Sequence, residues 1–328
     1  MMNRKGVLAI GGGIALLIGI MFFFKNPDES DQIKRFKVTV CKVIEHEAIN
    51  AVAEGIRDEL SPDSEFELET STCQGNQGVA SQIASKAAND DTKIFVTIGT
   101  TPTQAAFKLA MEGKLNLVFS SVTNPGDIAA SFESSNTTGV SNFIPLKPQI
   151  ELFKRIQPNL KRLGIIYNSS ESNSVAIVDA LRPILQEMGI TMVVRCIQKS
   201  SDLPQAVNSV VNEIDAIFIS NDNTALAGIP FIIKICNRRK IPVYVSDTDQ
   251  VEKGCLAALG PNQFDIGRQT GAMIKKIKNG TDINDIKIEY PKANELFINL
   301  EAARTVGITI PSDIISNADK VFGGDRKK

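Results

Sequence analysis

Two stretches of the chain follow one order of patterns: IFVTIGTTPTQAAFKLAMEGKLNLVFSSVTN (residues 94–124) and DAIFISNDNTALAGIPFIIKICNRRKIPVYVSDTD (residues 215–249). Each begins with a short apolar run, passes through a polar loop into a segment with helical spacing, and ends in a second apolar run followed by polar residues. The segments upstream, 36–60 and 162–189, match each other in the same way. A duplicated β-loop-α series predicts two similar α/β lobes with parallel sheets.

The bulk composition agrees with two soluble lobes. The chain has 328 residues, and at roughly 100–200 residues per domain this length suits two domains. Apolar residues make up 43% and charged residues 22%, which is ordinary for a globular protein. The formal net charge of −1 gives no basic field that would attract nucleic acid, so no nucleic-acid partner is predicted.

The N-terminus carries a second kind of signal. Gly6 to Phe24 is an uncharged, apolar run of 19 residues that follows Arg4 and Lys5. This length can cross a bilayer, and no small-residue cleavage site follows it. We expect an uncleaved transmembrane helix within residues 1–25 and a linker over 26–35, with the rest of the chain outside the membrane. The alternative is a cleaved signal peptide and a secreted protein.

Strand and helix signals alternate along the rest of the chain. In the first half, strands are expected at 36–43, 66–71, 94–99 and 115–122, with helices at 47–60, 77–89 and a third that Thr101 caps, Pro102 begins and Gly113 ends. In the second half, strands are expected at 163–168, 191–197, 215–220 and 241–247, with helices at 173–188, 203–212 and 224–239. The C-terminal part predicts a strand at 255–260, a helix at 263–279, short strands at 287–290 and 296–300, and a helix near 300–306.

Ligands of open α/β sheets collect outside the carboxyl ends of the strands, and polar residues follow these ends in both halves. The first half offers mainly hydroxyls, amides and helix N-termini, which suit an anion, at Thr100, Thr101, Gln104, Thr123 and Asn124. The second half adds carboxylates, which suit a cation, and its candidates are Glu171, Asn173, Ser174, Asp222, Asn223, Thr224 and Asp247. This asymmetry predicts a zwitterion whose carboxylate lies near Thr100 and Thr101 and whose ammonium lies near Asp222 or Glu171.

Several of these residues have a purely structural alternative. Thr101, Asn173 and Asn223 could act only as helix N-caps, each worth about 1 kcal/mol. Glu171 and Asp222 could act only through the helix dipole. His46 is the only histidine in the chain, and at a strand end it could be a catalytic group. No nucleophile motif accompanies it, which favours a hydrogen-bonding or structural role.

Other motifs are absent from the sequence. The chain has no phosphate-binding G-x-x-x-x-G-K-[ST], no H-E-x-x-H and no G-x-S-x-G, so we predict no cofactor, no metal and no catalytic site. The five cysteines include no C-x-x-C pair. Cys41 and Cys73 fall on neighbouring strands and could form a bridge, although ordinary buried thiols are the favoured interpretation.

A series of motifs resembles one known family. The substrate-binding proteins of ABC transporters, of the type of the bacterial tryptophan/tyrosine-binding proteins, share them over about residues 36–311. The motifs are Thr-Thr-Pro-Thr-Gln (100–104), Val-Thr-Asn-Pro (122–125), Asn-Thr-Thr-Gly-Val-Ser (136–141), Glu-Ser-Asn-Ser (171–174), Asp-Asn-Thr (222–224), Val-Glu-Lys-Gly-Cys-Leu-Ala-Ala-Leu-Gly (251–260), Asp-Ile-Gly-Arg-Gln-Thr (265–270) and the segment 299–311.

The resemblance implies a type I periplasmic-binding-protein fold, in which two Rossmann-like lobes joined by three crossovers close over a small solute. The crossovers are then expected near 139–146, 258–264 and 287–294. Lobe one would comprise 36–140 with 261–290, and lobe two 141–260 with 291–322. The expected function is that of the monomeric, non-enzymatic solute-binding component of an ABC importer, anchored at the periplasmic or extracellular face of a bacterial membrane. It would pass an amino acid, aromatic in some family members, to a permease driven by a separate ATPase.

The chain departs from the family pattern at several positions. Asn124 stands where the family usually has Asp, and Pro261 to Phe264 replace an aromatic-rich stretch. With no Trp and three Tyr, an aromatic ligand would have to contact Phe143, Tyr244 or another Phe. Two other functions remain open: a membrane-tethered ligand sensor, and an enzyme that uses His46 and Glu171 as acid and base.

Overall fold

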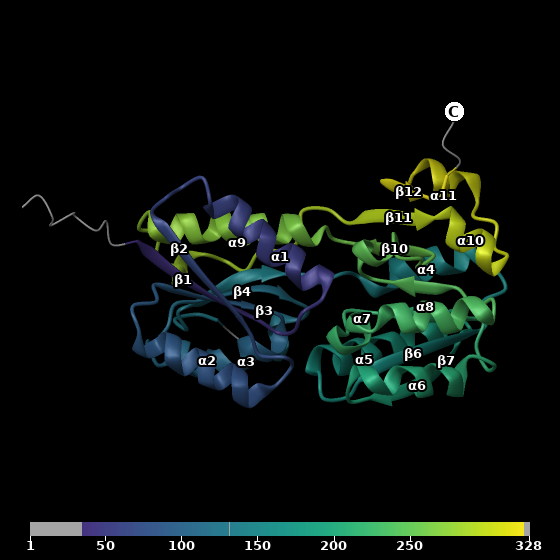
Figure 1. The fold of residues 1–328 in the computed structure, drawn as a ribbon, viewed down its shortest axis with the longest axis horizontal. Coiled ribbons are helices and arrows are strands. Elements are labelled where there is room, and N and C mark those ends of the chain that lie inside the picture. Colours follow the sequence, from purple (N-terminus) through teal and green to yellow (C-terminus); the bar gives the residue numbers. More distant parts are fainter. Residues whose placement is uncertain (1–34, 131, 325–328) are drawn as a thin grey trace, which may run out of the picture. The chain divides into compact units, whose positions relative to one another are not determined.

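The computed structural model describes residues 35–130 and 132–324, and these residues form two separate β-sheets (Figure 1). One sheet has five strands in the order β2-β1-β3-β4-β5, and the other has seven in the order β12-β11-β10-β9-β8-β6-β7. All pairs are parallel except β10 with β11. The parallel α/β architecture predicted from the sequence is therefore confirmed.

Lobe one is the five-stranded sheet with the helices that cover it. Its strands are β1 (Phe36–Lys42), β2 (Phe66–Thr72), β3 (Ile94–Ile98), β4 (Leu117–Val122) and β5 (Thr137–Ser141), and its helices are α1 (Glu47–Leu60), α2 (Gln77–Asn89), α3 (Thr100–Met111) and α9 (Gln263–Lys278). In Figure 1, α1 and α9 lie side by side on one face of the sheet, and α2 and α3 cover the other. Because both faces are covered, β3, β4 and β5 are buried throughout.

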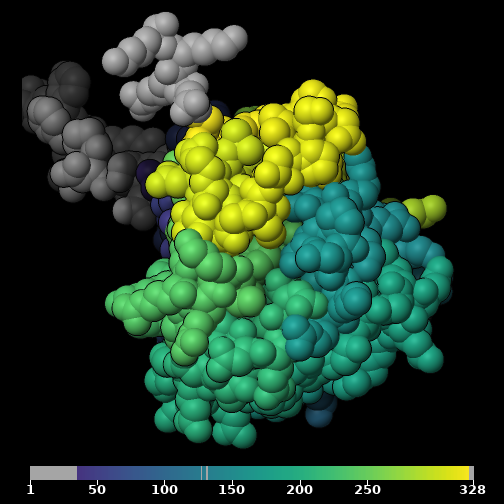
Figure 2. Space-filling view, turned by 90° about the vertical axis from the view of Figure 1, so that its right-hand side faces the viewer, coloured from purple at the N-terminus to yellow at the C-terminus, as the bar shows by residue number. Residues whose placement is uncertain are grey.

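Lobe two is the seven-stranded sheet with its helices. Its strands are β6 (Arg162–Asn168), β7 (Thr191–Ile197), β8 (Ala216–Ile219), β9 (Val243–Val245), β10 (Ala257–Gly260), β11 (Glu295–Asn299) and β12 (Lys320–Phe322). Its helices are α4 (Leu146–Ile156), α5 (Ser172–Glu187), α6 (Leu203–Val210), α7 (Asn223–Ala227), α8 (Ile229–Arg238), α10 (Leu300–Val306) and α11 (Ser312–Ser316). Figure 2 shows the C-terminal residues, in yellow, packed against the rest of this lobe. Short 3-10 turns lie at Pro125–Asp127, Ser200–Asp202, Thr248–Gln250 and Ile283–Asp285.

Within the described residues, the chain passes between the two sheets three times. It leaves lobe one after β5 and enters α4, returns between β10 and α9, and leaves again between Glu289 and β11. Glu289 still belongs to lobe one, because it forms a parallel bridge with Val140. The segment 287–290, expected as a strand, forms only this isolated bridge.

The contact between α1 and α9 depends on glycine. A Cβ on Gly267 would lie 2.1 Å from the carbonyl oxygen of Val52, and a Cβ on Gly55 would lie 2.0 Å from that of Phe264. The two helices therefore touch through their backbones. Since α9 directly follows the second crossing, this contact fixes the position at which the chain re-enters lobe one.

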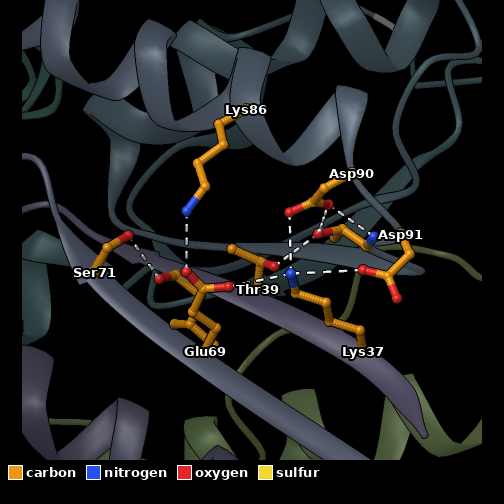
Figure 3. Close-up of polar contacts among 9 residues, drawn as sticks. Lys37, Thr39, Glu69, Ser71, Lys86, Asp90 and Asp91 are labelled. Atoms are coloured by element: carbon orange, nitrogen blue, oxygen red, sulfur yellow. Dashed lines mark hydrogen bonds and ion pairs between the residues drawn. The ribbon is translucent and has the colours of Figure 1, made fainter. Parts of the chain in front are cut away.

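A cluster of charged residues around Lys37 lies at the amino ends of the lobe-one strands (Figure 3). Lys37, at the start of β1, donates to Asp90 at 3.0 Å and pairs with Glu69 at 3.2 Å. The hydrogen bonds to Asp90 and Glu69 raise the pKa of Lys37. This cluster joins β1, β2 and the loop before β3 at their amino ends, which leaves the carboxyl ends of the strands free for another role.

Two helix starts differ from expectation. Helix α3 begins at Thr100 and not after Thr101, because Gly99 is its N-cap residue at φ 96° and the side chain of Val43 leaves no room for a Cβ there. The single helix expected at 224–239 is divided into α7 and α8 at Gly228, since Pro230 sits in the first turn of α8.

Two expectations concern the membrane and the cysteines. Among the described residues, no helix has the length and apolarity that a membrane span requires. The predicted anchor at Gly6 to Phe24 lies outside these residues. All five cysteines lie in the described part of the chain and are free thiols, which agrees with the favoured interpretation for Cys41 and Cys73.

Replacing Gly267 by Ala should destabilise the protein by about 1–3 kcal/mol, because the added methyl group meets backbone atoms of α1 that have no room to move. Chemical denaturation of the variant measures this loss. Gly78→Ala is the matched control, since its methyl group would meet only the end of the Asn76 side chain. Equal stability of both variants with the parent would contradict the backbone contact.

Candidate functional site

The carboxyl ends of strands from both lobes surround one cavity. The centre of a water molecule can occupy about 20 Å³ of it, so the cavity is narrow. Lobe one lines it with His46, Ala48, Ile49, Gly99, Thr100, Ser121 and Thr123, and lobe two with Asn173, Asn221, Asn223, Leu226 and Asp247. Asn142, in the first crossing, and Gln263, at the start of α9, complete the wall. The cavity thus lies at the position that an open α/β sheet offers a ligand.

The lobes touch each other around this cavity. The imidazole Nε2 of His46 lies 3.3 Å from the amide oxygen of Asn223. Beside it, Gln104 donates to the hydroxyl of Ser172 at 3.1 Å, and Lys253 pairs with Glu47 at 2.7 Å. Each of these contacts joins a residue of lobe one to a residue of lobe two, so the cavity is held between two bodies in contact.

Two helices of lobe one begin at the cavity wall. Helix α1 starts after His46 and helix α3 starts after Gly99, and within the described chain no side chain caps either start. The first N–H groups of a helix have no partner within the helix and carry partial positive charge. Two such starts beside Thr100 and Ile49 make this wall suitable for an anion.

Several other polar groups of the wall lack a well-placed partner. Among the described residues, five buried atoms of the wall make no hydrogen bond of standard geometry: Nδ1 of His46, Oδ1 of Asn142, Oδ1 of Asn173, and Oδ1 and Oδ2 of Asp247. The amide orientation of Asn173 is fixed, because its Nδ2 donates to the carbonyl oxygen of Asn221 at 2.8 Å. Buried polar atoms in native proteins almost always have partners, so water or a ligand would have to supply the donors here.

The buried charge of Asp247 is the strongest of these requirements. Burial raises the pKa of its carboxyl to about 7, and repulsion by Asp249 acts in the same direction. A cation in the cavity would reverse this shift, because an opposite charge at close range favours the ionised carboxylate. For His46, burial lowers the pKa to about 4, so the imidazole is neutral at pH 7.

The comparisons with known proteins agree with this architecture. A family model described as "ABC transporter substrate binding protein" matches residues 37–322. The chain belongs to this family. Its members are substrate-binding components of ABC transporters and act outside the cytoplasm, on small-molecule solutes.

One curated relative and two solved structures are similar to this chain over most of its length. The chain is 26% identical over 287 residues to a tyrosine-binding protein of Clostridioides difficile, covering 85% of this chain and 83% of that protein. It matches an ABC domain from Streptococcus pneumonia in complex with L-Trp at a TM-score of 0.82 and 26% identity, covering 88% of this chain and all of the other (100%). It also matches the ligand-free, open structure of a substrate binding protein with adhesive properties from Clostridium difficile, at a TM-score of 0.64 and 28% identity, covering 87% and 99%.

The last two matches differ in how well they superpose on this chain. Their sequence identities to this chain are similar, but the L-Trp complex superposes much better than the open structure. The arrangement of the lobes here is therefore closer to that of the relative that contains an amino acid. The contacts between the lobes around the cavity agree with this.

The structure brings together only part of the residues selected from the sequence. Thr100, Thr123, Asn173, Asn223 and Asp247 line the cavity. The lining of the described cavity does not include Thr101, Gln104, Asn124, Glu171, Ser174, Asp222 or Thr224. Of these, Gln104 contacts the other lobe, Asn124 caps the turn at Pro125–Asp127, and Thr224 donates to Glu171.

The carboxylates expected to receive the ammonium have other partners. Asp222 accepts from the backbone N–H groups of Asn168 at 2.6 Å and Ala225 at 2.7 Å, and so caps α7. Glu171 accepts four bonds, from the backbone and side chain of both Asn223 and Thr224. Both carboxylates join the loops after β6 and β8, which matches the structural alternative. Asp247 is the carboxylate that lines the cavity, and its nearest donors, the backbone N–H of Asp249 and the side chain of Gln250, make no hydrogen bond of standard geometry with it.

The wall also contains residues that were not selected from the sequence, and three of them share a hydrogen-bond network. Ser121 sits at a bulge of β4 with φ 55°, accepts from Asn142 at 2.8 Å and donates to Gln263 at 3.1 Å. This bond network joins β4, the first crossing and α9. Ser121 follows a strand end and could have been found by that signal, whereas Asn142 and Gln263 reach the site only because the crossings pass beside it.

Of the two aromatic residues that were expected to contact an aromatic ligand, only Phe143 lines a cavity. Tyr244 is fully buried in the core of lobe two, where its ring stacks on that of Phe153 at 4.3 Å. Phe143 is 47% exposed and lines a second, mainly apolar chamber of about 460 Å³ of atom-free space. This chamber shares Thr123 and Asn221 with the polar cavity. In the described residues, no group of three potential metal ligands occurs.

The Asp247 carboxyl has a folded-state pKa near 7 and an unfolded value near 3.8, so the ligand-free protein should lose stability as the pH rises from about 4 to 7. Asp247→Asn removes this cost. The variant should therefore be more stable than the parent at pH 8, by up to about 4 kcal/mol, and equal to it near pH 4. Thermal denaturation at both pH values tests this.

Asp222→Asn is the matched control for Asp247→Asn. Burial also raises the pKa of Asp222 to about 7, but its oxygens accept two backbone bonds that the amide cannot both replace. This variant should be less stable than the parent at pH 8. A loss of stability in Asp247→Asn of the same size would show that Asp247 is a structural group like Asp222.

Proposed function

We propose that this substrate-binding protein takes up an α-amino acid with an apolar side chain in the cavity between its lobes and delivers it to an importer. The observation that carries the proposal is the division of the cavity wall. Unpaired acceptors, including a buried carboxylate, lie on one part of the wall, and uncapped helix starts lie on another. An amino acid carries the two complementary charges on adjacent carbon atoms.

The ammonium group fits the acceptor side. It has three N–H donors and one positive charge, and the cavity wall offers it the carboxylate of Asp247 and the amide oxygen of Asn173, which make no hydrogen bond of standard geometry within the described protein. A buried carboxylate that receives a charged donor gains far more than an exposed one, because little water competes for it. The sequence placed the ammonium group near Asp222 or Glu171. In this proposal the ligand is still a zwitterion, but its ammonium group lies near Asp247.

The carboxylate group fits the helix side. The starts of α1 and α3 present N–H groups that lack intrahelical partners, and Thr100 adds a hydroxyl. Anions bind at helix N-termini because the N–H groups and the helix dipole act together. Both helices belong to lobe one, whereas Asp247 belongs to lobe two. One amino acid would therefore bridge the lobes and favour their contact.

The side chain has room in the apolar chamber. Ile144, Leu146 and Ile177 line it together with Phe143, and it adjoins the polar cavity at Thr123 and Asn221. An apolar side chain entering this chamber would gain about 25 cal/mol for each Å² that it removes from water. The relatives named for tyrosine and containing L-Trp support this class of ligand.

The transport role follows from the family. We propose lobes that comprise 36–140 with 261–290, and 141–260 with 291–322, closing by a hinge at the three crossings. The chain would work with a membrane permease and a separate ATPase, tethered at the outer face of the membrane by Gly6 to Phe24. It would release the solute unchanged.

A thermal-shift screen with the L-amino acids tests the ligand class. A binder at 100 times its Kd should stabilise the protein by about 2.7 kcal/mol. For tyrosine and leucine, the α-hydroxy acids and the decarboxylated amines should give much smaller shifts, because each lacks one of the two charges. Shifts with sugars or nucleosides and none with amino acids would refute the zwitterion.

A larger residue in the wall of the apolar chamber tests whether the side chain of the ligand lies there. Ala176→Leu adds three carbon atoms to its α5 wall, and should weaken the binding of large apolar amino acids about tenfold or more while changing that of alanine little. Isothermal titration of both ligands gives the ratio. An equal loss for alanine and for the large amino acids would place the side chain elsewhere.

A further inference from the structure

We propose that His46 is a specificity-determining residue that accepts a hydrogen bond from the ligand's ammonium through Nδ1 and passes the effect to lobe two through Nε2–H and Asn223. This inference rests on the proposed function, because it requires a ligand with an amino group. It goes beyond charge pairing at Asp247. The chain's single histidine would bind the ligand and also hold the two lobes together, so that ligand binding strengthens the contact between the lobes.

The orientation of Asn223 begins the argument. Its Nδ2 donates to Oε2 of Glu171 at 2.7 Å, and the same oxygen receives the backbone N–H of Asn223 at 3.0 Å. Oε1 of Glu171 receives both donors of Thr224. A carboxylate that accepts four bonds has no proton to give, so Asn223 must turn its NH2 group toward Glu171. Its amide oxygen then faces His46.

The orientation of Asn223 determines the tautomer of His46. The Asn223 oxygen only accepts, and it lies 3.3 Å from Nε2 of His46. Nε2 must therefore carry the proton in the neutral ring, which leaves Nδ1 with a free lone pair. Nδ1 is buried and has no partner among the described residues, and its ring lines the cavity. Glu171, outside the cavity, thus decides that the histidine presents an acceptor to the guest.

The surroundings of His46 keep the ring neutral. Burial lowers its pKa to about 4, and the nearby charge of Lys253 acts in the same direction. The bond to Asn223 and the charges of Glu45 and Glu47 act against them. Asp247, on the opposite lobe, lines the same cavity. A neutral acceptor beside Asp247 receives an ammonium group, whereas a protonated imidazole would repel it.

The position of the bond couples binding to closure. His46 belongs to lobe one and Asn223 to lobe two, so their contact forms only when the lobes meet. A donor at Nδ1 polarises the imidazole and strengthens donation from Nε2, because hydrogen bonds in series reinforce each other. Ammonium at Nδ1 therefore stabilises the contact between the lobes. A ligand with a carboxylate but no donor at this position would not do so.

Two substitutions separate the two ring nitrogens. In His46→Gln, an amide nitrogen can replace Nε2–H toward Asn223, but nothing replaces the Nδ1 acceptor. In His46→Asn, an amide oxygen replaces Nδ1, but the side chain is too short for the bond to Asn223. Ser172→Ala is the matched control, because it removes the bond between Ser172 and Gln104 across the lobes without touching the cavity wall.

The experiment uses the full chain with L-tyrosine and L-leucine, followed by calorimetry between pH 4.5 and 8. A solvent-exposed histidine titrates near pH 6.5, so binding should release a proton from His46 below this pH. Asp247, with a pKa near 7 in the ligand-free protein, also loses a proton when an ammonium group binds, so the share of His46 is the part of the proton release that His46→Gln removes. In the parent and in Ser172→Ala, affinity should fall as pH falls. His46→Gln should bind at least about tenfold more weakly at pH 7.5 and distinguish the amino acid from its α-hydroxy analogue less well than the parent, because only Asp247 still selects the ammonium group. His46→Asn should keep the parental distinction.

A spectroscopic readout tests the tautomer directly, because one histidine gives one pair of imidazole nitrogen signals. With L-tyrosine or L-leucine bound, the nitrogen shifts should report a proton on Nε2 and no titration down to about pH 5. A proton on Nδ1, an imidazole that still titrates near 6.5, or parental affinity in His46→Gln would each overturn the role of His46. If no amino acid shifts the melting temperature at all, the proposed function itself fails, and this inference with it.

Discussion

The buried carboxylate of Asp247 is the constraint on which the site depends. Its two oxygens make no hydrogen bond of standard geometry among the described residues, and burial raises its pKa to about 7 although the backbone N–H of Asp249 and the side chain of Gln250 act against this shift. A poorly paired buried charge costs several kcal/mol. Under the proposed function, the cost that weakens the empty protein would become affinity for a cationic ligand. Stability and binding would then be opposed at this residue.

The fold supplies this constraint through backbone geometry more than through side chains. Strands of both sheets end at the cavity, and helices α1 and α3 start there without side-chain caps. The close contact of Gly267 with Val52 fixes α9, whose first residue Gln263 completes the wall. Hydrogen bonds and ion pairs of Lys37 stabilise lobe one at the amino ends of its strands, which lie far from the site. The carboxyl ends thus remain available to a ligand.

Much of the fold could be predicted, because its causes are local. The apolar runs at β3 and β8 and the helical spacing in α1 are visible in single segments, and their boundaries agree closely with the structure. The site was harder to predict. A strand-end search finds Thr100, Asn173 and Asp247, but it selects Glu171 and Asp222 equally, because all of them follow apolar runs. Nothing in a single loop tells whether its carboxylate faces a cavity or a neighbouring loop.

The sequence by itself determined two α/β lobes, a family, and polar residues at the strand ends of both lobes, because burial periodicity and turn chemistry act over a few residues. The tertiary structure alone decided which polar atoms remain unpaired. Glu171 is occupied by Asn223 and Thr224, which lie 52 and 53 residues away, and His46 meets Asn223 across 177 residues. Whether a group is satisfied depends on partners that only folding brings together, so the identity of the ligand-facing acceptors is a property of the three-dimensional arrangement.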